Sequence, residues 1–299
     1  MNSRTLLNIG LLVLLLGLGL LVLFEPGIEP PPPPTTLTTF NQDDITHVRI
    51  DREQQEPLQL DRQQGGWRVL AEQPIPTSEF QVLSLLELAG TETKRSYPLD
   101  QLDLGKLGLD PASAKVTFNN ELTIEFGTTE PLSGYRYVRV DDAVHLIKDR
   151  YQHLIEADIS TFIDHRLLRE GSRITRLQLP RMTLAYTDET HWSLVPEDPD
   201  VSADAIQELL DAWQHASALW VRKYAAGSAE AQAQVHIQLE GTQDTIEFEI
   251  MARQPELVLA RPDWHIQYHL IGESTDKLFN FTKPTTDDDP QSDKDEGRI

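Results

Sequence analysis

The stretch Ile45-Thr46-His47-Val48-Arg49-Ile50 has a counterpart in the second half of the chain, Ile174-Thr175-Arg176-Leu177-Gln178-Leu179. A shift of 124 residues also places Ser78 on Ser202 and the tripeptide His-Leu-Ile at residues 145–147 on the same tripeptide at residues 269–271. Most matching positions are apolar residues or turn residues, which specify packing, and no catalytic group is duplicated. The sequence therefore predicts two copies of one structural unit.

Each copy alternates short β patterns with one helical pattern. Ser78 and Ser202 are suited to cap the two helices, with Thr77 as an alternative cap in the first, and apolar residues follow at helical spacing. Apolar residues at every second position favour strands with one covered face. The expected strands are residues 45–52, 58–61, 67–70, 114–118, 122–126, 135–140 and 143–147, then 174–179, 183–187, 192–195, 234–240, 245–250, 256–260 and 266–271. We expect an α+β fold made of two tandem, mainly antiparallel domains, residues 42–168 and 169–282.

The second helical pattern is expected to run to about Ala218. Trp213 and Trp220 are seven residues apart within it, a spacing typical of one apolar stripe facing a core. A patch facing a partner is the alternative interpretation. A groove between the two copies is a natural docking surface, because pockets often occur at domain interfaces.

The amino-terminal stretch Thr5 to Phe24 contains no charged residue. A helix of this length spans about 30 Å, the hydrocarbon thickness of a bilayer. Arg4 precedes it and Glu25 follows it, so residues 1–4 are expected in the cytoplasm and the bulk of the chain in the periplasm. A cleaved signal peptide has a shorter apolar region and a small-residue cleavage site, whereas Pro26 follows here. We therefore expect a single-pass anchor in a bacterial inner membrane.

Segments of low complexity flank the two copies. Residues 25–41 contain five consecutive prolines and several threonines, which favour a stiff polyproline stalk. Residues 283–299 are rich in aspartate and lack apolar residues able to build a core, which is typical of a disordered acidic tail.

Composition excludes several classes of function. The formal net charge of −22 argues against nucleic-acid binding, which depends on an excess of lysine and arginine. The chain has no cysteine, which rules out thiolate nucleophiles, thiolate zinc sites and disulfides.

The sequence contains no recognisable catalytic or cofactor motif. It lacks the Gly-x-Ser-x-Gly elbow of serine hydrolases and the glycine-rich loops that bind nucleotides. His265 and His269 have a spacing that would suit two metal ligands on a helix, but the local pattern indicates a strand, on which they would not converge. We therefore expect no metal and no cofactor. A pair of carboxylates acting on a glycan stays open, because the fold alone decides which acidic residues meet.

One strand combines aromatic and basic residues and is the candidate binding site. Tyr135, Arg136, Tyr137 and Arg139 could form a face for an acidic or glycan partner. The alternative is structural: the tyrosines cover the sheet and Arg136 pairs with acidic residues on neighbouring strands.

The chain resembles the DUF4340 domain family over roughly residues 40–280. The residues that carry the resemblance are Gly66-Trp67 followed by Pro74, then Lys94-Arg95-Ser96-Tyr97, Leu107-Gly108-Leu109-Asp110-Pro111, Glu125-Phe126-Gly127 and Tyr135-Arg136-Tyr137-Val138-Arg139. The resemblance implies a single-pass bacterial envelope protein without an assigned activity. It also implies a genomic neighbourhood with an ABC transporter whose extracytoplasmic subunit resembles gliding-motility components.

Together these features favour a non-enzymatic, membrane-anchored periplasmic module that binds or scaffolds envelope proteins. An accessory subunit of an ABC-type transport assembly is the specific form of this hypothesis. The alternative is an envelope enzyme that acts on glycan through an unrecognised carboxylate pair.

Overall fold

The computed structural model describes residues 3–24, 35–187, 191–224, 227 and 230–281. The chain divides into two compact units, residues 1–35 and 36–299. Most of the predicted stalk (residues 25–34) and the predicted acidic tail (residues 283–299) lie outside the described residues.

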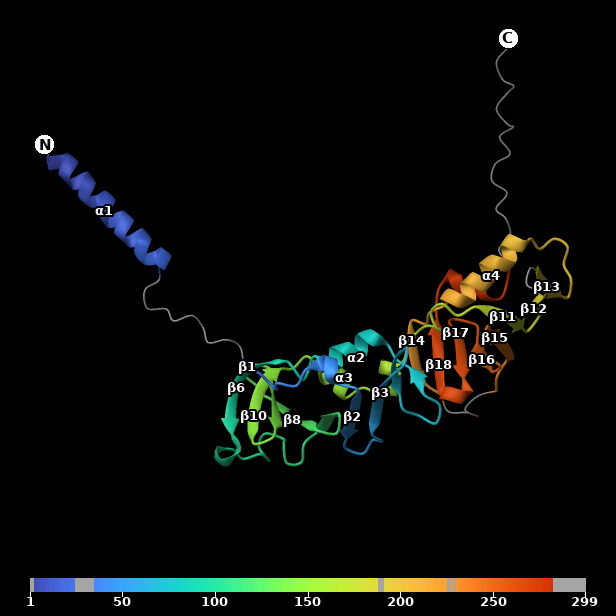
Figure 1. Ribbon diagram of the computed structural model, residues 1–299, viewed down its shortest axis with the longest axis horizontal. Coiled ribbons are helices and arrows are strands. Elements are labelled where there is room, and N and C mark those ends of the chain that lie inside the picture. The colour runs from blue at the N-terminus through green and yellow to red at the C-terminus, as the bar shows by residue number, and fades with distance from the viewer. Residues whose placement is uncertain (1–2, 25–34, 188–190, 225–226, 228–229, 282–299) are drawn as a thin grey trace, which may run out of the picture. The chain divides into compact units, whose positions relative to one another are not determined.

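The first unit contains helix α1 (Ser3–Phe24; Figure 1). The large apolar side chains described in it, Ile9, Leu11–Leu16 without interruption and Leu18, are all exposed. A search of the described residues finds no helix that is long and apolar enough to cross a membrane. The anchor over residues 5–24 stays a prediction.

The second unit is built on two sheets (Figure 1). The first has ten strands in the order β1-β6-β10-β9-β8-β7-β2-β3-β4-β5. Their bounds are Thr35–Thr36 (β1), His47–Arg52 (β2), Leu58–Gln63 (β3), Gly66–Val69 (β4), Ile75–Pro76 (β5), Glu92–Pro98 (β6), Ala114–Phe118 (β7), Leu122–Thr129 (β8), Tyr135–Val140 (β9) and Ala143–Lys148 (β10).

The second sheet has eight strands in the order β13-β12-β11-β15-β16-β17-β18-β14. Their bounds are Ile174–Leu179 (β11), Met182–Thr187 (β12), His191–Val195 (β13), Trp220–Lys223 (β14), Ala233–Leu239 (β15), Thr245–Ala252 (β16), Leu257–Arg261 (β17) and Ile266–Leu270 (β18).

The two sheets share one strand order. The run β6-β10-β9-β8-β7-β2-β3-β4 of the first corresponds, strand by strand, to β14-β18-β17-β16-β15-β11-β12-β13 of the second. Every pairing between neighbouring strands in these two eight-strand runs is antiparallel. The α+β class with mainly antiparallel sheets is therefore confirmed, and the short strands β1 and β5 extend the first sheet alone.

Each sheet carries one main helix, α2 (Glu79–Leu86) and α4 (Ala203–His215). In α4 the buried residues are Ile206, Leu209, Leu210 and Trp213, the spacing of a single amphipathic face. Trp213 packs on Phe248 of β16, with ring centroids 6.2 Å apart, so this face covers the second sheet. The other helices of the second unit are short: α3 (Gln152–Ile155) and the 3₁₀ segments Gln42–Asp44, Leu99–Gln101, Ile159–Phe162, Pro262–Trp264 and Glu273–Leu278.

Four strands escaped prediction, the two-residue strands β1 and β5 and the longer strands β6 and β14, and one residue was placed on the wrong element. β6 has the sequence ETKRSYP, which lacks apolar alternation, and β14 follows α4 so closely that it was merged with it. The prediction that Trp220 shares a helical stripe with Trp213 is wrong. Helix α4 ends at His215, and Trp220 lies on β14 with its ring stacked on His269 at 5.7 Å.

The connection between the sheets is hydrogen-bonded to the first sheet and to the segment that leads into β14 of the second. Asp164 N donates to Pro76 O (3.1 Å) in the first sheet. Leu167 N donates to Ala216 O (3.0 Å), and Ala218 N donates to His165 O (2.8 Å), just before β14. Buried residues of both sheets belong to one continuous hydrophobic cluster. The two copies are therefore packed together within one unit.

Candidate anion-binding site

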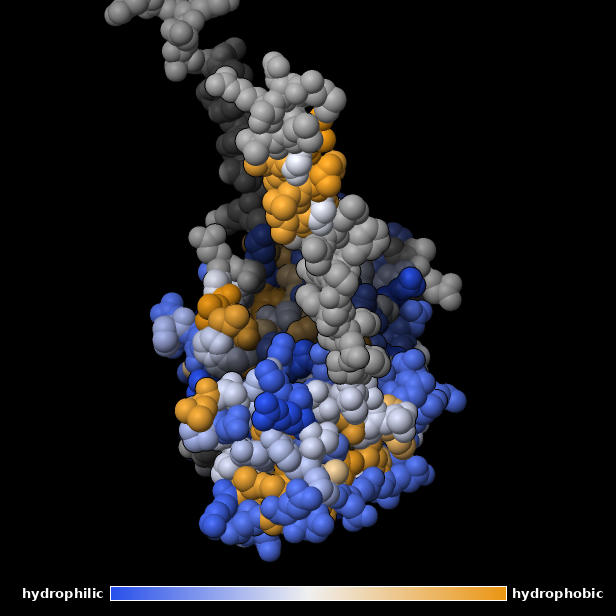
Figure 2. All heavy atoms as spheres, turned by 90° about the vertical axis from the view of Figure 1, so that its left-hand side faces the viewer, coloured by the Kyte–Doolittle hydropathy of each residue, from blue (hydrophilic) through white to orange (hydrophobic). Residues whose placement is uncertain are grey.

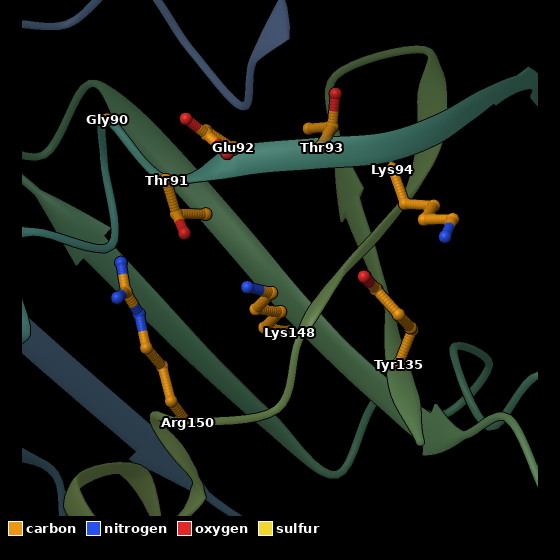
Figure 3. A pocket seen from close by; sticks show the side chains of 8 residues that line it. All are labelled: Gly90, Thr91, Glu92, Thr93, Lys94, Tyr135, Lys148 and Arg150. Carbon is orange, nitrogen blue, oxygen red and sulfur yellow. The ribbon is translucent and has the colours of Figure 1, made fainter. Parts of the chain in front are cut away.

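A cavity of about 570 Å³ lies at the β6 end of the first sheet (Figure 3). We call it the Lys148 cavity. Its lining residues come from β6 and the turn before it, from β9, and from the end of β10, and they are Gly90, Thr91, Glu92, Thr93, Lys94, Tyr135, Lys148 and Arg150. Figure 2 shows this end of the second unit as mainly hydrophilic, with small apolar patches between the polar residues.

Strand register explains why these side chains meet. Lys148 on β10 lies directly opposite Tyr135 on β9, so both project from the same face of the sheet. On the other side of β10, Leu146 pairs with Arg95 and Ile147 pairs with Thr93, which leaves Lys94 as an extra residue in a β-bulge. The bulge turns Lys94 toward β9, where its Nζ atom lies 5.2 Å from the centre of the Tyr135 ring.

The cavity is cationic although the chain is strongly acidic. Figure 3 shows Lys148 between Arg150 and Tyr135, while Glu92, the one carboxylate among the lining residues, points to the other side of β6. Arg150 reaches Glu87 only at 4.0 Å, and its Nε donates to the Tyr151 hydroxyl at 3.1 Å. Within the described residues neither Lys94 nor Lys148 forms an ion pair. Their charges are therefore available to a ligand.

The structure divides the four predicted binding residues between two faces of β9. Tyr135, Tyr137 and Arg139 lie on the outer face, and only Tyr135 lines the cavity. Arg136 lies on the opposite face and is 7% exposed. Its Nε donates to Asp149 at 2.9 Å and its Nη1 to Gly127 O at 3.3 Å. Arg136 is thus held by the carboxylate of Asp149, just after β10, and by a carbonyl oxygen of β8.

Arg139 and Tyr137 are also engaged within the sheet. Arg139 pairs with the buried Glu125 at 2.5 Å, and Lys115 reaches the same carboxylate at 2.7 Å. The Tyr137 hydroxyl lies 3.5 Å from Glu130. Burial, followed by the Glu130 charge, raises the pKa of Tyr137, so this hydroxyl stays protonated and neutral. Both residues are therefore occupied by partners within the sheet. The positive charges that can interact with a ligand are those of Lys94, Lys148 and Arg150.

Sequence reasoning missed these three cations. Lys94 belongs to the Lys94-Arg95-Ser96-Tyr97 run that carried the family resemblance, but β6 was not predicted to be a strand. Lys148 comes directly after the predicted strand of residues 143–147, and Arg150 lies outside the predicted strands, so neither position indicated a site. Arg95, the next residue on β6, interacts with Tyr97, whose hydrogen bond raises the pKa of Arg95.

No histidine is among the residues that line this cavity. His265 ends the 3₁₀ turn before β18 with φ of 53°, whereas His269 is buried on β18 and its Nδ1 lies 2.9 Å from Glu256. The described residues contain no group of three or more histidine and acidic side chains that could hold a metal ion. His145, on β10, is hydrogen-bonded to Ser96 at 2.8 Å, and burial lowers its pKa.

A second hollow, of about 620 Å³, lies where the two sheets approach each other. Arg52, Leu58 and Val69 line it from the first sheet, and Lys223 and Trp264 line it from the second. A groove between the copies was expected. Its lining mixes positive and negative side chains, including Glu56 and Asp158, and so carries no single recognisable charge.

These features define an α+β protein of two like-ordered antiparallel sheets with a cationic, aromatic cavity at one sheet end. The family model described as "Domain of unknown function (DUF4340)" matches residues 67–234, from β4 into β15, and the chain belongs to this family. No curated protein and no solved structure matches the chain.

Proposed function

We propose that this protein is a membrane-anchored, extracytoplasmic binding module that holds an acidic segment of a partner protein in the Lys148 cavity. The observation that carries the proposal is the gathering of Lys94, Lys148 and Arg150 around Tyr135 in a chain of net charge −22.

The cavity is positively charged while the chain as a whole is negatively charged, and this difference supports binding of an acidic partner at one defined place. Most of an acidic surface repels an acidic partner, while a local group of cations attracts it, so the partner is directed to one place. Tyr135 adds an aromatic ring already positioned under Lys94. Such an arrangement holds carboxylates by charge-assisted hydrogen bonds and the aliphatic parts of a peptide by contact with the ring.

Anchoring is proposed from the amino-terminal segment. The uncharged stretch of residues 5–24, with Arg4 before it and Glu25 after it, favours a single pass through the bacterial inner membrane with the two sheets in the periplasm. An accessory role in an ABC-type transport assembly extends the proposal, and its support is the family resemblance.

Hydrolysis of a glycan finds less support in the cavity. That chemistry uses two carboxyl groups that face each other across the scissile bond. Glu92 is the one carboxylate among the residues that line the cavity, and it points away from the cations (Figure 3). Binding is therefore the better proposal for this site.

Binding of a labelled oligoglutamate peptide to the full chain in detergent, measured by fluorescence anisotropy, tests the site. We expect the double variant Lys94→Gln/Lys148→Gln to bind at least about tenfold more weakly, because two charge-assisted contacts are lost. Wild-type binding should also weaken as salt is raised. Lys106→Gln is the matched control, since Lys106 is an exposed lysine on a loop that pairs with Asp103.

Equal binding by the wild type and the double variant would disprove the proposed site, and so would an equal loss with Lys106→Gln. The peptide is also tested on a chain that lacks residues 283–299, because the acidic tail could compete for the same cations. Anchoring is tested separately: deletion of residues 1–24 should move the protein from the membrane fraction to the soluble fraction. Retention in the membrane fraction would contradict the anchor.

A further inference from the structure

A smaller cavity, of about 180 Å³, is lined by both sheets and by the segment that connects them. We call it the Tyr268 cavity. Arg68 on β4 contributes from the first sheet, and Arg261 and Tyr268 on β17 and β18 contribute from the second. Asp164, Arg166 and Arg169 contribute from the connecting segment.

Tyr268 gives the cavity an unused hydrogen-bond donor. Its side chain is completely buried, and its hydroxyl has no hydrogen-bond partner within the described residues. A buried polar group without a partner is unfavourable, and native proteins rarely leave one unsatisfied. Burial strongly raises the pKa of Tyr268, so the hydroxyl remains protonated and can donate.

The charged groups around the cavity leave two arginines unpaired. Arg166 binds both Asp164 (2.8 Å) and Glu170 (2.6 Å). Arg261 is 7% exposed, pairs with Asp263 at 3.1 Å and lies 3.2 Å from the centre of the Trp264 ring. Within the described residues Arg68 and Arg169 form no ion pair.

Arg169 reaches across to the first sheet. A Cβ atom placed on Gly65, in the turn between β3 and β4, would lie 2.5 Å from its Nη2 atom. The Arg169 guanidinium is therefore packed against the turn that leads into β4, the strand that carries Arg68. Four arginines thus face three carboxylates, Asp164, Glu170 and Asp263, and the excess charge is positive.

We propose that the Tyr268 cavity binds a small oxyanion, a carboxylate or phosphate group, between the two sheets. The Tyr268 hydroxyl donates one hydrogen bond to it, and the guanidinium groups of Arg68, Arg169 and Arg261 supply the charge. A volume of 180 Å³ corresponds to about six water molecules at roughly 30 Å³ each, which suits phosphate or a small dicarboxylate.

Such a ligand would join the two sheets, because its contacts come from both. A ligand that binds only the folded state raises stability in proportion to the logarithm of its concentration above the dissociation constant. The site is separate from the Lys148 cavity and shares no lining residue with it. Failure of one proposal therefore leaves the other untouched.

Calorimetric titration and thermal unfolding of the full chain in detergent test this site, with inorganic phosphate and succinate as probes. Ionic strength is held constant with chloride. We expect saturable binding and a rise in midpoint temperature for at least one probe. The stronger of the two identifies the chemical class of the ligand.

Three variants locate the binding. Arg68→Gln should weaken it by about tenfold or more, because a charge-assisted contact is lost. Tyr268→Phe should weaken it up to about tenfold without lowering the stability of the ligand-free protein, because the hydroxyl is unsatisfied there. Arg176→Gln, which removes an exposed arginine from β11 outside the cavity, should leave binding unchanged.

Two results would overturn the proposal. One is the absence of any effect of phosphate or succinate beyond that of chloride. The other is a loss of binding in Lys94→Gln/Lys148→Gln with none in Arg68→Gln, which would place the anion in the Lys148 cavity instead.

Discussion

Arg136 and Arg139 are three residues apart on β9, and alternation of a strand therefore turns them to opposite faces. Arg136 faces Asp149, whose side chain is 11% exposed, while Arg139 faces outward to Glu125. Glu125 keeps a second cation, Lys115, and Asp149 has no second cation within the described residues. Loss of Arg136 would therefore leave a carboxylate without a cation, whereas loss of Arg139 would not.

We predict that Arg136→Gln lowers the free energy of unfolding by about 3 kcal/mol, because a buried carboxylate loses its partner. Arg139→Gln should cost about 1 kcal/mol, since Lys115 still neutralises Glu125. Urea unfolding of both variants measures the difference. Equal costs would show that Arg136 is less important to the sheet than its burial indicates.

The two main helices show how equivalent elements diverge. Ser202 caps α4, with its Oγ accepting a hydrogen bond from Ala205 N at 3.1 Å. Ser78 occupies the same position before α2 but makes no such side-chain bond. Instead its backbone N donates to Phe162 O at 2.8 Å, in the segment that follows the first sheet. The first helix is thus positioned by tertiary contact at a point where the second is stabilised locally.

Ser202→Ala should therefore lower the free energy of unfolding by about 1 kcal/mol, the usual cost of losing a helix cap. Ser78→Ala is its natural control within the same chain and should change stability by less than about 0.5 kcal/mol. Thermal unfolding followed by circular dichroism compares them. A larger loss for Ser78→Ala would mean that its hydroxyl has a role the hydrogen bonds do not indicate.

At the scale of the whole second unit, the two sheets are packed together in one compact unit. Leu167 and Leu168 of the connecting segment are buried, and they line the Tyr268 cavity together with residues of β4 and β5 from the first sheet and of β15 and β16 from the second. The hydrophobic cluster is continuous through this point. We therefore expect a loss of stability in one sheet to destabilise the other.

Leu167→Ala should destabilise both sheets together, by about 2–5 kcal/mol, because a buried leucine at their junction leaves a cavity. Hydrogen exchange followed by mass spectrometry reports on each sheet separately. The slowest-exchanging amides of β8 and of β16 should both exchange faster, and to a similar degree. Leu132→Ala, at a fully exposed hairpin position, provides the control. Faster exchange in β16 alone would show that the sheets unfold independently.

Local pattern was sufficient for much of the fold. The strands Ala114–Phe118 and Tyr135–Val140 were predicted with their exact bounds, because alternating apolar residues record which face is covered. The likeness between the two halves of the sequence is matched by the identical order of their strands. Strand bounds and the repeat depend on residues close together in the sequence, so a local pattern is enough to predict them.

Only the tertiary structure decided where β6 and the cavities are. β6 has no apolar alternation and becomes a strand because β10 supplies its hydrogen-bond partners; its bulge then turns Lys94 toward Tyr135. Lys148 and Arg150 join them through register, and Arg68, Arg169 and Tyr268 meet through the packing of two sheets. The sequence by itself determined the repeated units, since periodicity is local. Contacts between distant residues created the sites, because no local pattern encodes which strand edges and which side chains will meet.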